Sequence, residues 1–148
     1  MTDPAPIPAE KPLRASPRAD GLPKRKARRK ATDDLEPLDL ARRIVDLAED
    51  KKAADIVLLE LFPLTTLADY FVICSGGSER QLDAIADGIL EGVRDQKVRP
   101  IGREGKPESH WVLLDFGSVI VHIFTPPERD YYQLEKHWSE AKTILRVQ

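Results

Sequence analysis

The sequence of 148 residues has little of what marks membrane, secreted or metal-binding proteins. No apolar run approaches the ~20 residues that a membrane helix needs. The N-terminus has no apolar block like that of a secretory signal peptide. The one cysteine, Cys74, cannot form a disulfide within the chain, and no Cys/His spacing suits zinc. These absences predict a cytoplasmic protein without a membrane segment, an internal disulfide or a structural metal.

Recognisable catalytic motifs are also missing. There is no Gly-x-Ser-x-Gly sequence, and nothing places any of the three histidines beside Cys74. The Gly76-Gly77-Ser78 sequence could hold a phosphate at a helix start, and it is similar to the Gly-Ser element of nucleotidyltransferases. Those enzymes add a closely spaced carboxylate pair for divalent metals, and no Asp-x-Asp occurs here. An ordinary turn and helix cap is the favoured interpretation, and no cofactor is expected.

Composition divides the chain near residue 36. Residues 1–36 contain six prolines and few hydrophobic residues, so we expect a disordered N-terminal tail. A basic run at 24–30 could contact RNA, and a merely solubilising tail is the alternative. Residues 37–148 carry 14 Lys/Arg against 19 Asp/Glu, which argues against an RNA cradle on the whole domain. The candidate RNA contacts are Lys24, Arg25, Lys26, Arg28, Arg29 and Lys30.

Apolar patterns along 37–148 alternate between helical and extended periods. Helices are predicted from Pro37 and, after a Ser78–Gln81 capping box, through to Val93. We predict an α/β or α+β fold in which helices cover a mixed sheet of about five strands. The other expected elements are strands at 55–61 and 69–74, a short edge strand at 98–101, a loop at 102–107, a hairpin at 109–124 and a helix at 128–146, broken near 137–139.

The hairpin organises the rest of the domain. Two apolar runs, 111–114 and 119–124, flank Gly117-Ser118, a pair typical of a two-residue turn. That turn pairs Trp111 with Phe124 and Leu113 with His122, so Trp111, Asp115 and His122 would share one face. A three-residue loop would move His122 to the other face. The opposite face is wholly apolar and is expected to be covered: Val112, Leu114, Val119, Val121 and Ile123.

Trp111 has two interpretations from its position alone. A tryptophan beside an acid and an imidazole suits the anchor of a protein interface, and an ordinary core residue is the alternative. His122 fits a structural histidine, and Asp115 could simply accept hydrogen bonds from the turn. The residues alone therefore indicate a compact binding module.

Several separated motifs resemble the ribosomal silencing factor (Iojap-like) family. They are KAADIV at 52–57, DYFVICSGGS at 69–78, EG at 104–105, WVLLDFGSVIVHIF at 111–124 and RDYYQLEKHW at 129–138. The likeness covers roughly residues 38–140. The chain departs from the family pattern at Ser118, where Asp is common, and at His137, where an apolar residue is usual.

The resemblance implies a non-enzymatic regulator of translation. Such factors bind the large ribosomal subunit through ribosomal protein L14 and obstruct joining of the small subunit when nutrients are short. Their fold resembles nucleotidyltransferases without the catalytic acids, and they are often homodimers. A nucleotidyltransferase-like enzyme and a general RNA-binding module are the alternatives. The partner-binding residues carried over are Trp111 as an aromatic anchor, with Glu104, Asp115, His122, Arg129, Tyr132 and Glu135.

Overall fold

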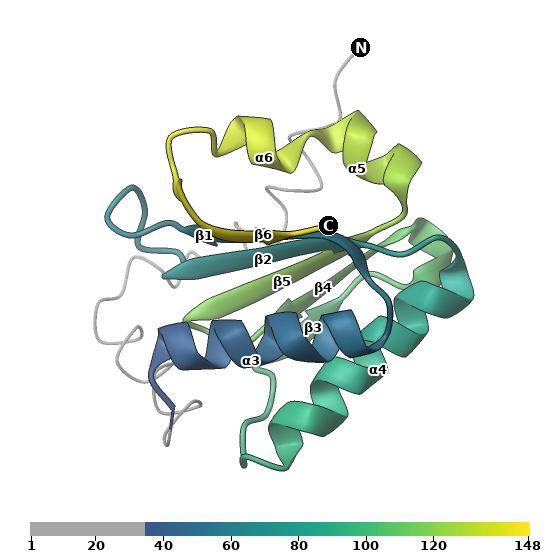
Figure 1. Ribbon diagram of the computed structural model, residues 1–148, viewed down its shortest axis with the longest axis horizontal. Coiled ribbons are helices and arrows are strands. Elements are labelled where there is room, and N and C mark those ends of the chain that lie inside the picture. The colour runs from purple at the N-terminus through teal and green to yellow at the C-terminus, as the bar shows by residue number, and fades with distance from the viewer. Residues whose placement is uncertain (1–34) are drawn as a thin grey trace.

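The computed structural model describes residues 35–148, which form a mixed six-stranded sheet with helices on both faces (Figure 1). The strand order is β3-β4-β5-β2-β1-β6; β2 and β5 run parallel, and the other neighbours are antiparallel. The expected disorder of the tail and its basic run fall outside these residues. The elements are α3 (Pro37–Asp50), β1 (Ala54–Glu60), β2 (Tyr70–Ser75), α4 (Glu79–Arg94), β3 (Gly102–Glu104), η3 (Pro107–Ser109), β4 (Trp111–Asp115), β5 (Val119–Phe124), α5 (Pro126–Tyr132), α6 (Leu134–His137) and β6 (Lys142–Val147).

Helices α3 and α4 lie together on one face of the sheet (Figure 1). The Ser78 half of the capping box is confirmed, because the Ser78 Oγ accepts a hydrogen bond from the Gln81 backbone N–H at 3.1 Å, while the Gln81 side chain accepts from the Gly77 N–H. The glycine at 92 allows the close contact between the helices. A Cβ there would lie 2.3 Å from a Leu47 methyl carbon, so a side chain at this position would force Leu47 or the helices to shift.

The sheet separates two hydrophobic cores. The first lies under α3 and α4 and takes the wholly apolar face of the hairpin, as predicted. The second lies under α5 and α6 and includes Trp111, Leu113 and Phe124. No helix in the described part of the chain has the length and apolarity needed to cross a bilayer.

The hairpin has the predicted register. Trp111 pairs with Phe124 and Leu113 pairs with His122, across a two-residue turn in which Gly117 has a φ of 89°. Glycine adopts that angle at little cost, so the turn stays short and His122 stays on the face of Trp111.

The predicted C-terminal helix over 128–146 is wrong in its second half. The chain turns at Gln133, which has a φ of 48°, and after α6 it becomes β6, antiparallel to β1. This strand covers the edge of β1, and Ile144, Leu145 and Val147 pack against the first core. Pairing with β1 therefore determines the conformation of this segment, which its local pattern did not reveal.

The predicted edge strand is displaced along the chain. Residues 98–101 are not a strand; Gly102–Glu104 form β3, inside the segment expected to be a loop. Pro100 has no backbone N–H to donate to a ladder, so pairing begins after it. The sheet thus has six strands where about five were expected, and the mixed sheet covered by helices is confirmed.

Candidate functional site

Trp111 lies at the start of β4 in the second core, and only 9% of its surface is exposed. Its ring lies 4.8 Å from that of Phe124 and 5.2 Å from that of Tyr132 on α5, measured between centroids. Its indole N–H donates to the His122 Nδ1 at 3.3 Å. This burial fits the core interpretation, and it leaves little of the indole accessible to a partner.

His122 is almost fully buried, at 1% exposure, on the same face as Trp111. Its ring meets Phe71 edge-on at 4.5 Å. Burial lowers the pKa of His122 from 6.5 to about 3, so the ring is neutral at physiological pH. A neutral imidazole enclosed by aromatic rings is a structural group, and it offers no charge to a partner.

Arg129 and Glu135 form a paired contact between α5 and α6. The Arg129 Nε and Nη2 donate to the two Glu135 carboxylate oxygens, each at 2.9 Å, and its Nη1 donates to the Ser75 hydroxyl at 2.8 Å. The Arg129 side chain is 11% exposed and that of Glu135 is 29% exposed. The guanidinium is therefore used inside the protein, where it ties both C-terminal helices to the end of β2.

Asp115 lies at the far end of β4 from Trp111. Its Oδ1 accepts a hydrogen bond from the Gly117 N–H at 2.8 Å, which confirms that it supports the hairpin turn. The structure thus brings Trp111, His122 and Tyr132 together. Asp115 lies on the same face of the sheet, but at the opposite end of β4 from Trp111.

Glu104 is exposed on the edge strand β3 and pairs with Leu113 of β4. The glycine that follows Glu104 allows the chain to pass close to the backbone of β4. Gly105 has a φ of 81°, and a Cβ there would lie 2.2 Å from the Trp111 carbonyl oxygen. The Glu-Gly pair therefore positions an exposed carboxylate beside the start of β4.

The Gly76-Gly77-Ser78 helix start is occupied by its own side chains. The Gln81 side-chain oxygen accepts from the Gly77 N–H at 2.7 Å, and the Ser78 hydroxyl accepts from the Gln81 N–H. These groups would otherwise face a phosphate, so the cap interpretation is supported. Among residues 35–148 there is no group of three His, Cys, Asp or Glu side chains that could hold a metal ion.

The structure also presents exposed aromatic groups that sequence reasoning missed. Tyr131, at 55% exposure, meets Tyr132 edge-on at 4.9 Å and extends the aromatic group at Trp111 to the surface. Phe62, at 53%, projects from the loop between β1 and β2. The adjacent Tyr-Tyr pair was a visible signal for the first; exposure of Phe62 depends on a loop conformation that no pattern revealed.

Comparison with known proteins shows similarity over the whole described domain. The family described as "Ribosomal silencing factor during starvation" matches residues 34–148. A ribosomal silencing factor of Halalkalibacterium halodurans is 40% identical over 106 residues, 72% of this chain and 91% of that protein. The mouse protein "Mitochondrial assembly of ribosomal large subunit protein 1" is 35% identical over 99 residues, 65% of this chain and 43% of that protein.

A crystal structure of a Chromobacterium violaceum protein has the same fold. It superposes with a TM-score of 0.69 at 33% identity, over 71% of this chain and 88% of that one. The family match covers the two cores, the hairpin and the C-terminal signature together. This chain belongs to the ribosomal silencing factor family.

Proposed function

We propose that this protein binds the large ribosomal subunit through ribosomal protein L14 and blocks its association with the small subunit. Membership of the silencing factor family carries the proposal, and the name of the mouse relative points to the same subunit. The mechanism is steric: a bound domain that covers part of the intersubunit face makes its own binding and subunit joining mutually exclusive. No catalytic turnover is required, and the protein would repress translation in the cytoplasm when nutrients are limited.

The contact surface that we propose lies where α5 meets the edge of the sheet. Tyr131 and Tyr132 present aromatic area there, packed against the largely buried Trp111. Glu104 adds a carboxylate on the neighbouring strand β3. The next residue, Gly105, packs closely on the Trp111 backbone and so keeps Glu104 near this surface. Aromatic residues beside a rim charge are typical of protein interfaces.

The chemistry of this surface favours a protein partner. A carboxylate repels RNA phosphates and attracts Lys or Arg side chains, and tyrosines provide contact area at low entropic cost. His122 and Arg129 support the surface from inside, because both make their contacts within the protein. Trp111 contributes mainly by holding the Tyr132 ring in place.

Co-sedimentation with purified large and small subunits tests the proposal. We expect the protein to pellet with large subunits alone, and the Glu104→Lys variant to bind at least tenfold more weakly, about 1.4 kcal/mol. Glu91→Lys is the matched control, since Glu91 is exposed on α4 across the sheet. Absence of binding to large subunits would refute the function. Equal binding by both variants would instead refute the surface.

The basic tail is proposed to add contacts with ribosomal RNA. Neutralising phosphates releases counterions, so affinity would fall steeply with salt. A chain beginning at Leu35 should bind large subunits more weakly and with a shallower salt dependence. Equal affinity and slope for both chains would exclude a contribution from the tail.

A further inference from the structure

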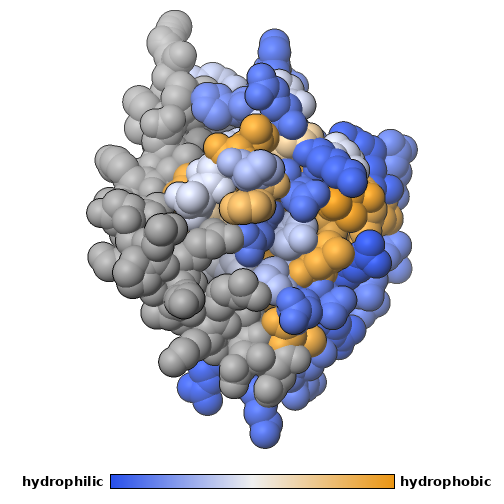
Figure 2. Space-filling view, turned by 90° about the vertical axis from the view of Figure 1, so that its left-hand side faces the viewer, coloured by the Kyte–Doolittle hydropathy of each residue, from blue (hydrophilic) through white to orange (hydrophobic). Residues whose placement is uncertain are grey.

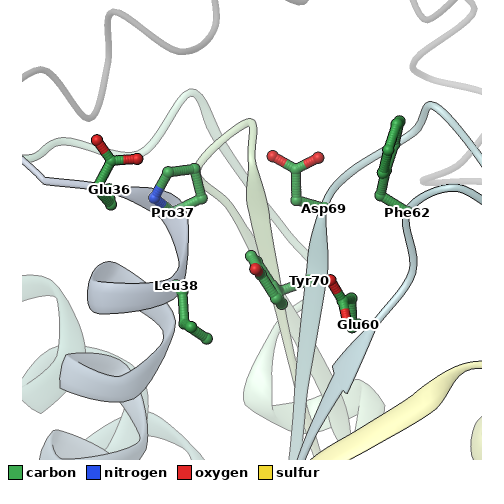
Figure 3. Close-up of a pocket in the computed structure, with 7 residues that line it drawn as sticks. All are labelled: Glu36, Pro37, Leu38, Glu60, Phe62, Asp69 and Tyr70. Carbon is green, nitrogen blue, oxygen red and sulfur yellow. The ribbon is translucent and has the colours of Figure 1, made fainter.

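A groove opens where α3 begins, at the end of the sheet that carries the loop between β1 and β2. It is lined by Glu36, Pro37, Leu38, Glu60, Phe62, Asp69 and Tyr70 (Figure 3). Pro37 and Leu38 belong to the first turn of α3, and Glu60 and Tyr70 face each other as paired residues of β1 and β2. The groove lies at the Tyr70 end of β2, whereas Trp111 lies level with the opposite end of that strand, because Ser75 pairs with Phe124 and Phe124 pairs with Trp111.

The lining of this groove is acidic. It holds three carboxylates and, among the residues that the structure describes there, no lysine or arginine. The pKa of Tyr70 is raised by burial and then by the charges of Glu60 and Asp69, and it is lowered by the charge of Arg42. Lys142 lies opposite Glu60 on β6 and offsets part of its charge. Glu60 pairs with Tyr70 across the two strands and Asp69 precedes Tyr70 in the chain, so both carboxylates flank this residue in the groove.

The groove also offers exposed aromatic surface. Phe62 is 53% exposed, and Leu64 in the same loop is 47% exposed. Figure 2 views the molecule from this end and shows hydrophobic areas lying among hydrophilic ones. In Figure 3 the Phe62 ring and the Asp69 carboxylate both stand above Glu60 and Tyr70. A groove lined by an aromatic ring and by carboxylates suits the stem and head of a lysine or an arginine.

The chain supplies a segment of the opposite charge close by. Six of the seven residues at 24–30 are basic, and the chain enters the described domain at the groove itself, where Glu36 precedes α3. Lys30 is six residues before Glu36, so it can reach at most ~20 Å from it. Such a short tether gives an effective concentration on the order of millimolar. Asp33 and Asp34 lie within the tether, so the basic run must pass them to reach the groove.

We propose that the basic run at 24–30 docks into this acidic, aromatic groove of its own chain and is thereby withheld from RNA. The same lysines and arginines cannot pair with the groove carboxylates and with RNA phosphates at once. Docking in the groove therefore weakens RNA binding by the tail, because the basic run must leave the groove before it can bind RNA. This inference does not depend on ribosome binding, and its test needs no ribosome.

Zero-length carbodiimide crosslinking of the full chain tests the docking, because the reagent joins a lysine amine to a carboxylate in contact with it. We expect Lys24, Lys26 or Lys30 to be joined to Glu60 or Asp69, with a yield that falls as salt increases. An equal mixture of unlabelled and ¹⁵N-labelled chains distinguishes crosslinks within one chain from those between two. Crosslinks spread evenly over other surface acids, or found only between chains, would overturn the proposal.

RNA binding by matched variants gives a second readout. Glu60→Gln/Asp69→Asn removes two groove charges, and Glu91→Gln/Asp95→Asn removes two exposed charges from the C-terminal end of α4. Both variants change the net charge equally. We expect the groove variant to bind a polyuridine oligonucleotide at least threefold more tightly than the α4 variant does. Equal affinities would overturn the proposal.

Discussion

Replacing Trp111 by alanine should destabilise the domain strongly, because this side chain is a core residue. Its surface is 9% exposed, and removal of a buried tryptophan costs about 3–5 kcal/mol. The variant also loses the hydrogen bond to the His122 Nδ1, which contributes on the order of 1 kcal/mol. We expect a loss of about 4 kcal/mol, a large part of the 5–15 kcal/mol typical of a domain.

Urea unfolding followed by far-ultraviolet circular dichroism measures this loss. Tyr131→Ala is the matched control, because it removes an aromatic ring that is 55% exposed, and it should cost less than about 1 kcal/mol. If Trp111→Ala lost less than about 1 kcal/mol, the packing described here would be refuted and Trp111 would be a free surface group. A loss near 4 kcal/mol means that weaker ribosome binding by this variant reports unfolding, so Glu104 is the better residue for the binding test.

Three further predictions concern His122, Glu135 and Gly105. Burial lowers the pKa of His122 to about 3, so below pH 6.5 the unfolded chain binds a proton at this residue and the folded chain does not. The free energy of unfolding of the wild type, measured in urea, should therefore fall by about 2 kcal/mol between pH 8 and pH 5, and that of His122→Gln should not show this fall. Glu135→Gln leaves the partly buried Arg129 guanidinium without its charge partner. It should lower the free energy of unfolding by about 1–3 kcal/mol and raise amide hydrogen exchange in α5. Unchanged exchange would contradict the role of the Arg129–Glu135 pair in holding α5. Gly105→Ala forces a Cβ against the Trp111 carbonyl at a positive φ and should lower the free energy of unfolding by at least about 1 kcal/mol, whereas an unaffected midpoint would show that β3 does not pack as described.

Local patterns predicted the part of the fold that local chemistry determines. The Gly117-Ser118 turn is short because glycine accepts its dihedral angle, and the turn length alone places His122 beside Trp111. The start of α4 follows from the Ser78 cap in the same way. In each case, residues close in sequence make the deciding contacts.

Contacts between distant segments determine what the patterns did not predict. Strand β6 forms because β1, more than eighty residues earlier, offers it an open edge. Trp111 is covered because α5 returns over the sheet and presents Tyr132. Arg129 meets Glu135 because the chain turns at Gln133, which has a φ of 48°, and a regular helix would not bring residues six apart together. None of these contacts has a periodic signature.

A subunit-joining assay tests the central claim most directly. Purified large and small subunits are mixed under associating magnesium concentrations, with increasing amounts of the protein, and sucrose gradients separate joined ribosomes from free subunits. Our account predicts that joined ribosomes decline as the protein saturates the large subunit, and that Glu104→Lys needs at least tenfold more protein than Glu91→Lys. Undiminished joining in the presence of saturating, large-subunit-bound protein would contradict the steric mechanism.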